Sequence, residues 1–389
     1  MSSKTIRNIP FFRSDVTDND INSAADRVKS ALTDPFQLVS KHEQEFSKLA
    51  KFSYTVSVDT LLSAIALSLK ALGVKQGDEV IAPAYTVPEI GEAVEHSGAS
   101  MVFADIDPVT LNLSVASAEA KISHKTKAVI LFDTAGLCAD VDAVMKMASS
   151  NGIYVIHCTY CSIAQQYNRE PAGSKPHIVI FFNNEPFIGG ANISTNMENT
   201  VSLIRSLGGH GIKPANKGQP GGADGDNWYY EIVSPGFDCM MTGIQAALHS
   251  VYANNAGRYL EGRRRIAKLY NSLLQPMKDM ILLPFPGASD VSHAWQLYIV
   301  RLIKGALGTS RDEFIKELGY NGIKASVHYI PLNIHPYYSK KYRYTYNTLP
   351  NTYEAYTSAV SLPLYASLSE DDARYVAQTV ADIVKRYSL

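Results

Sequence analysis

The chain has 389 residues, of which 46% are hydrophobic and 19% are charged, and its formal net charge is -1. These values exclude a small disulfide scaffold, a disordered chain and a basic nucleic-acid-binding protein. No window approaches the roughly 18 apolar residues of a membrane span, and the N-terminus has no apolar secretory segment. We therefore expect a cytoplasmic protein with neither nucleic acid nor a membrane as a partner.

The first half of the chain alternates helical and extended patterns. Residues 59–72 are apolar on most faces, begin at an aspartate and end before a glycine, which predicts a buried helix. Short apolar runs follow at 80–83, 101–105, 128–132, 154–156 and 178–182, separated by helix-length segments. This order predicts an α/β fold with a mostly parallel sheet covered by helices on both sides.

The second half has a different pattern. Residues 206–236 are rich in Gly and Pro and predict a long surface loop, and residues 243–274 then predict one or two long helices. A strand at 296–302, a helix at 311–318, a strand at 324–330 and a helix at 369–387 follow. We divide the chain into a large domain with an N-terminal arm, residues 1–255, and a small C-terminal α+β domain, residues 256–389.

Several segments together resemble the DegT/DnrJ/EryC1/StrS sugar aminotransferases, which are fold-type I pyridoxal-phosphate (PLP) enzymes. They are ALGVKQGDEVIAPAYT (71–86), GASMVFADIDPVTLNL (98–113), KTKAVILFDTAGLCADVDAVMKMAS (125–149), GFDCMMTGIQAAL (236–248), GIKASVHYIPL (322–332) and SLPLYASLSEDDARYV (361–376). The resemblance implies the fold-type I architecture and a dimer, formed by two copies or with a homologue. It also implies a nucleotide-linked keto- or amino-sugar as ligand.

The cofactor positions implied by the resemblance are altered in this chain. The family's PLP lysine follows a strand that corresponds to 180–182, yet no lysine lies between Lys175 and Lys213. A Schiff base requires an amine, so none can form with that segment. His157 and Cys158 stand where the family has a Glu-Asp pair. Four further positions differ in the same way: Thr60-Leu61-Leu62 for Ser-Gly-Thr, Val87 for the ring-stacking aromatic residue, Phe181 for a serine and Asp238 for an asparagine. We therefore expect no cofactor.

The altered positions carry groups with chemistry of their own. His157, Cys158, Cys161 and Asp133 are the candidate catalytic residues, because they are expected to converge at the strand ends. One interpretation is a His–Cys pair, in which the imidazole lowers the thiol pKa and Asp133 orients the ring. A second is a metal site formed by these four residues. The third is that the cysteines only fill space.

The candidate substrate-binding residues come from the resemblance and from the altered cofactor loop. They are Tyr85, Asn183, Asn184, Glu185, Asp238, His328 and Tyr329. Three functions stay open. The chain is a PLP-independent enzyme acting on a sugar-like substrate, a non-catalytic subunit that pairs with an active aminotransferase, or a PLP aminotransferase whose lysine lies elsewhere.

Overall fold

The structure is a computed structural model that describes residues 6–389, except 33, 35, 161–165, 168–169, 172–174, 184, 186–187, 215–229, 289–290 and 292. Its centre is a seven-stranded sheet in the order β1-β9-β8-β5-β4-β2-β3. The strands are β1 (Tyr54–Val58), β2 (Glu79–Pro83), β3 (Ser100–Ala104), β4 (Thr126–Phe132), β5 (Tyr154–Tyr160), β8 (Ile178–Phe182) and β9 (Ala191–Thr195). β9 runs antiparallel to β1 and β8, and the other strand pairs of this sheet are parallel, so the predicted mostly parallel sheet is confirmed.

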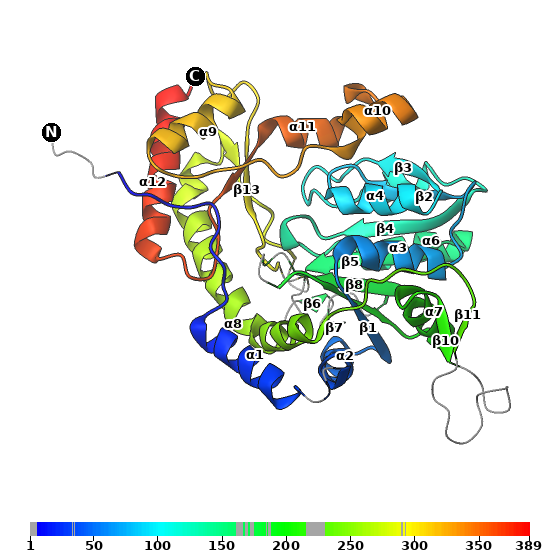
Figure 1. The fold of residues 1–389 in the computed structure, drawn as a ribbon. Helices are drawn as coiled ribbons and strands as arrows, with labels where there is room; N and C mark the ends of the chain where they lie inside the picture. Colours follow the sequence, from blue (N-terminus) through cyan, green and yellow to red (C-terminus); the bar gives the residue numbers. More distant parts are fainter. Residues whose placement is uncertain are drawn as a thin grey trace.

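Helices cover both faces of this sheet (Figure 1). One face packs against α3 (Leu61–Ala71), α4 (Pro88–His96) and α7 (Glu198–Gly208). The other face packs against α5 (Val115–Glu119), α6 (Val141–Asn151), α2 (Phe36–Ala50) and the N-terminal half of α8 (Gly243–Leu274). Since both faces are buried, β4, β5 and β8 are nearly continuous apolar runs, as expected for parallel strands between helices.

A second apolar core lies in the C-terminal part. It joins the C-terminal half of α8, α9 (Arg311–Tyr320), α12 (Glu370–Tyr387) and an antiparallel sheet of β12 (Ile281–Leu282), β13 (Tyr298–Leu302) and β14 (Ala359–Leu362). The other elements are α1 (Asp18–Ser30), η1 (Thr134–Gly136), β6 (Gln166–Tyr167), β7 (Glu170–Pro171), β10 (Ile212–Pro214), β11 (Tyr230–Ile232), η2 (Gln275–Met277), η3 (Leu332–Ile334), α10 (Pro336–Tyr342), η4 (Tyr346–Thr348) and α11 (Pro350–Ser358).

The strand predicted at 324–330 is wrong. Lys324 donates to Ile9 in the N-terminal arm, Ser326 to Ser361 in β14, and Leu332 to Ala84 after β2. Because the backbone groups of this segment bond to three separate elements, no ladder forms with any one of them. The segment instead crosses from the C-terminal core to the edge of the large sheet.

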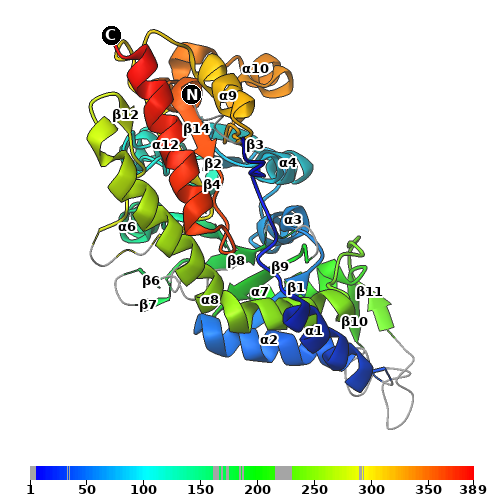
Figure 2. The ribbon, with the colours of Figure 1, turned by 90° about the vertical axis from the view of Figure 1, so that its left-hand side faces the viewer.

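Helix α8 is one uninterrupted helix of 32 residues. Thr242 caps it through a reciprocal capping box with Gln245. Figure 2 shows its N-terminal half beside α1 and α2 and its C-terminal half beside α12, in agreement with the contacts between these elements. The helix runs through residue 255, and the division of the chain at that position stays a prediction. None of the described helices has the length and apolarity that a bilayer crossing demands.

Two buried histidines join α2, β9 and α8. His42 Nε2 lies 3.0 Å from Asn192 Oδ1 and its Nδ1 lies 3.0 Å from Ser250 Oγ. His249 contacts Asn192 Nδ2 at 3.4 Å, and its other nitrogen pairs with the Gly189 carbonyl. Burial lowers the pKa of His42 from 6.5 to about 4 and that of His249 from 6.5 to about 3. Both rings are therefore neutral in the folded chain at neutral pH.

We predict that the free energy of unfolding falls as the pH decreases from 6.5 to about 4. In this window the unfolded chain binds protons at these histidines while the folded chain does not, so protonation favours unfolding. Urea denaturation followed by circular dichroism across this range measures the loss. His42→Gln should reduce its pH dependence, whereas His124→Gln, at an exposed position, should not. Equal pH dependence in all three proteins would contradict the prediction.

Candidate functional site

The candidate site lies at the carboxyl ends of β4, β5 and β8, where open α/β sheets bind ligands. Segment 328–332, which comes from the C-terminal part of the chain, contacts the strand ends of the large sheet. Leu332 donates its backbone N–H to the Ala84 carbonyl at 2.8 Å, and the Tyr85 hydroxyl donates to the His328 carbonyl. The site is therefore formed by residues from both cores.

Aromatic side chains pack together at these strand ends. The Phe132, Tyr160 and Phe182 rings come from three adjacent strands, with centroids 4.6–6.1 Å apart. The Tyr329 ring meets Phe132 edge-on at 6.0 Å, and its hydroxyl lies 2.9 Å from the Tyr160 hydroxyl. Burial raises the pKa of Tyr329 and of Tyr85, so both phenols stay protonated and serve as hydrogen-bonding groups.

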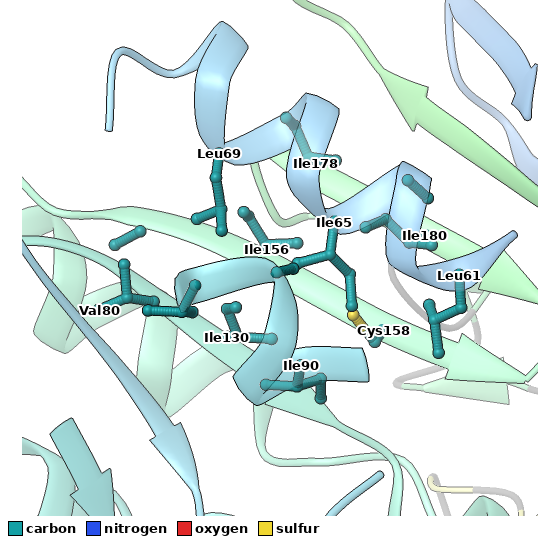
Figure 3. Close-up of a cluster of buried hydrophobic side chains, with 14 of the residues drawn as sticks. Leu61, Ile65, Leu69, Val80, Ile90, Ile130, Ile156, Cys158, Ile178 and Ile180 are labelled. Carbon is teal, nitrogen blue, oxygen red and sulfur yellow. The ribbon is translucent and has the colours of Figure 1, made fainter. Parts of the chain in front are cut away.

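Cys158 lies on the helix α3 side of β5. Its thiol is fully buried among apolar side chains that include Leu61 and Ile65, as Figure 3 shows. Burial, with a smaller contribution from Asp133, raises the pKa of this thiol. The interpretation of a His–Cys pair, in which the imidazole lowers the pKa of the Cys158 thiol, is therefore wrong. The reason is the alternation of side chains along a strand, which sends neighbours His157 and Cys158 to opposite faces.

His157 pairs with Asp133 on the α6 side of the sheet. His157 Nε2 lies 2.7 Å from Asp133 Oδ1, and both side chains are fully buried. The Ala139 N–H also donates to this carboxylate oxygen at 2.9 Å. Cys138 completes a cluster in which the three ligating atoms lie within 4.8 Å of one another. Sequence reasoning paired His157 with Asp133 but missed Cys138, whose spacing of five residues from Asp133 was the available signal.

Asn183 and Glu185 lie together after β8. The Glu185 carboxylate accepts from the Ser14 hydroxyl at 2.6 Å and from the Asp15 N–H at 3.2 Å. Asn183 accepts the Glu185 N–H at 2.9 Å, and its Nδ2 is buried with no partner among the described residues. A cavity of about 30 Å³, large enough for water, adjoins both residues and the buried Arg263.

Sequence reasoning missed the N-terminal arm at this place. Asp15 pairs with Arg263 at 2.6 Å and accepts the Ala366 N–H at 2.7 Å. The two members of the ion pair are 248 residues apart in the chain. No local pattern signals such a contact. Burial raises the pKa of Asp15 against the opposing effect of Arg263.

The remaining predicted residues are dispersed. His328 Nδ1 lies 3.0 Å from Ser361 Oγ, its ring stacks on Phe11, and burial lowers its pKa from 6.5 to about 4. Asp238 is exposed, and its Oδ1 lies 3.7 Å from His210 Nε2. This ion pair involves none of the strand-end residues named above. Cys161 and Asn184 lie outside the described residues.

The fold has counterparts among solved structures. A mostly parallel seven-stranded sheet with a smaller C-terminal region defines the fold-type I aminotransferase class. The PMP form (with pyridoxamine phosphate) of a putative sugar aminotransferase from Streptococcus pneumoniae superposes with a TM-score of 0.86 at 25% identity, covering 97% of this chain and 100% of that one. Helicobacter pylori PseC, at 18% identity, shares the fold with a TM-score of 0.86, covering 98% of this chain and 100% of that one.

Within this class, the chain belongs to the DegT/DnrJ/EryC1/StrS aminotransferase family, whose sequence profile matches residues 15–381. It is 35% identical over 355 residues to the Bacillus subtilis (strain 168) spore coat polysaccharide biosynthesis protein SpsC, covering 89% of this chain and 90% of that protein. The resemblance inferred from the sequence segments is thus confirmed.

The expectation of no cofactor is wrong. The Streptococcus pneumoniae neighbour was solved in both a PMP form and a PLP form, and the family is one of aminotransferases. PLP is therefore the expected cofactor of this chain. The absence of a lysine from one segment did not warrant an expectation about the cofactor itself, because only the internal Schiff base requires that lysine.

The segment after β8 does not provide a lysine with which PLP could form a Schiff base. Residues 176–212 contain no lysine to form a Schiff base. The neutral Cys158 thiol offers no negative charge to a pyridinium nitrogen, and the aromatic rings at the strand ends pack against one another. A cofactor in this chain consequently depends on contacts other than an internal lysine bond to this segment.

We predict that Cys158 reacts with iodoacetamide more slowly than Cys239 in the folded chain. Cys158 is fully buried, whereas Cys239 retains 7% exposure and has a pKa raised only to about 11. Peptide mapping by mass spectrometry at successive times measures both rates, and labelling in urea supplies the unfolded reference. Faster labelling of Cys158 would contradict the burial described above.

Proposed function

We propose that the chain acts in sugar biosynthesis by binding a nucleotide-linked keto- or amino-sugar at the strand-end site, with PLP or its amino form as cofactor. The observation that carries this proposal is the contact of segment 328–332 with the strand ends. This segment resembles the family's substrate-side motif, and it meets the ends of β2 and β4 through Leu332 and Tyr329. When bound, the cofactor supplies an electron sink for amine transfer.

The chain's own polar groups support ligand binding. The Tyr160–Tyr329 hydroxyl pair lies within an apolar cluster. The His328 ring is partly exposed, and the unpartnered Asn183 amide lies beside Glu185 and Arg263. Sites for small polar ligands are commonly built in this way. A pyridoxamine cofactor carries its own amine, so its retention needs no lysine. The unpartnered Asn183 amide is the group that we expect to contact it.

We predict that His328→Gln weakens binding of a nucleoside-diphosphate sugar by about tenfold, because one hydrogen bond in a partly buried site is lost. Saturation-transfer NMR against a panel of such sugars identifies a ligand, and calorimetry measures the affinity. His124→Gln, at an exposed position just before the amino end of β4, is the matched control and should bind normally. Failure of every sugar to bind the wild-type chain would overturn the proposal.

The cofactor part has a separate test. We expect pyridoxamine phosphate to bind reversibly and to be removed by dialysis. Borohydride treatment with PLP, followed by peptide mapping, reports any covalent lysine adduct. An adduct on a lysine lining the site would instead support a PLP aminotransferase with a displaced lysine. Binding of neither form would overturn the cofactor part while leaving sugar binding testable.

A second candidate is a non-catalytic subunit that pairs with an active aminotransferase. The observations that favour it are the lysine-free stretch 176–212 and the buried, neutral Cys158 at the position of the ring aspartate. Co-expression with a lysine-containing homologue distinguishes the two candidates. Activity that requires both chains, and that survives His328→Gln in this chain, favours the non-catalytic subunit.

We propose that the chain forms a dimer through segment 230–244. This segment exposes Ile232 (66%), Val233 (54%), Phe237 (43%) and Ile244 (63%), a concentration of apolar side chains typical of an interface. The double variant Ile232→Asp, Ile244→Asp should sediment as a monomer where the wild type is a dimer. Tyr320→Asp, at an equally exposed position on α9, should leave the dimer intact. A monomeric wild type without a co-purifying homologue would contradict the proposal.

A further inference from the structure

Asp133, Cys138 and His157 form a cluster of ligating side chains on the α6 side of the sheet. Asp133 directly follows β4, His157 lies in the middle of the adjacent strand β5, and Cys138 follows the turn after β4. All three residues are buried, and their ligating atoms lie within 4.8 Å of one another. This cluster does not belong to the strand-end site, which lies on the other face of β5.

The hydrogen bonds of the cluster are incomplete. Asp133 Oδ1 is used by His157 and by the Ala139 N–H, but Asp133 Oδ2 and His157 Nδ1 have no partner among the described residues. Both atoms are buried in an apolar core that includes Leu131 and Val155. Leaving polar atoms buried without partners is unfavourable, because their hydrogen bonds to water are lost on folding and are not replaced. An ion bound at the carboxylate would satisfy Asp133 Oδ2, whereas His157 Nδ1 lies on the side of the ring that faces away from this carboxylate.

A cavity reaches the cluster from one side. Its volume is about 440 Å³, and its lining includes Cys138, Asp140 and Asn112. The Cys138 side chain therefore lies between the cavity and the Asp133–His157 pair. The cavity supplies an entry path for an ion, and it also supplies room for a water molecule as a further ligand.

We propose that Asp133, Cys138 and His157 bind one divalent transition-metal ion of the zinc class. Carboxylate, thiolate and neutral imidazole together are a ligand set that zinc accepts. Ligand atoms at a tetrahedral zinc ion are about 3.3–3.7 Å apart, so these three side chains, whose ligating atoms lie within 4.8 Å of one another, must adjust to bind one ion. Binding releases the proton of the Cys138 thiol to solvent, and the neutral imidazole donates a ring-nitrogen lone pair.

Cobalt titration of the reduced, chelator-treated full chain tests the site. We expect a near-ultraviolet thiolate-to-cobalt charge-transfer band that saturates at one ion per chain and disappears when zinc is added. Cys138→Ala should lose the band, and His157→Gln should weaken binding more than tenfold. Cys158→Ala removes the same sulfur atom from the other face of the sheet and should keep the band.

Protection mapping on the wild-type chain keeps the test valid if a variant fails to fold. Zinc should protect Cys138 from alkylation and leave the rate at Cys239 unchanged. The proposal is overturned if no charge-transfer band forms, if folded Cys138→Ala retains the band, or if zinc leaves the alkylation of Cys138 unchanged. None of these readouts depends on the sugar or on the cofactor.

Discussion

The burial of both faces of the central sheet is the constraint on which the rest of the structure depends. Strand β5 is the fourth of seven strands, so every side chain along it enters one of two packed layers. Successive residues must then serve different layers. His157 joins the polar cluster beside α6, whereas Cys158 joins the apolar layer beneath α3. Adjacent positions in the sequence thereby acquire unrelated chemical environments.

Membership of the family and the local chemistry of the site give different information. The profile match and the fold relate the whole chain to sugar aminotransferases that hold PLP or PMP. The residues after β8 lack the amine on which covalent retention depends. The fold is held by its apolar cores, so residues at the strand ends can differ from those of the family without loss of the fold. The reacting groups occupy only a few positions of that scaffold.

Local patterns predicted much of the fold. The runs at 80–83, 101–105, 128–132, 154–156 and 178–182 all became strands, because burial on both faces leaves a continuous apolar signal. The run at 324–330 did not, since its partners lie in three elements distant in sequence. The Asp133–His157 pair was predictable because β4 and β5 are adjacent parallel strands, and their register places the residue after Phe132 beside His157 and Cys158. The Asp15–Arg263 pair was not, because nothing in either segment encodes a partner 248 residues away.

Helix α8 has a mechanical consequence. At about 1.5 Å per residue its 32 residues extend for roughly 48 Å, and its two halves are built into different apolar cores. Any rotation of the C-terminal core relative to the sheet must therefore bend α8, because this helix has no break between its two halves. The continuity of α8 therefore opposes relative rotation of the two apolar cores that contribute residues to the strand-end site.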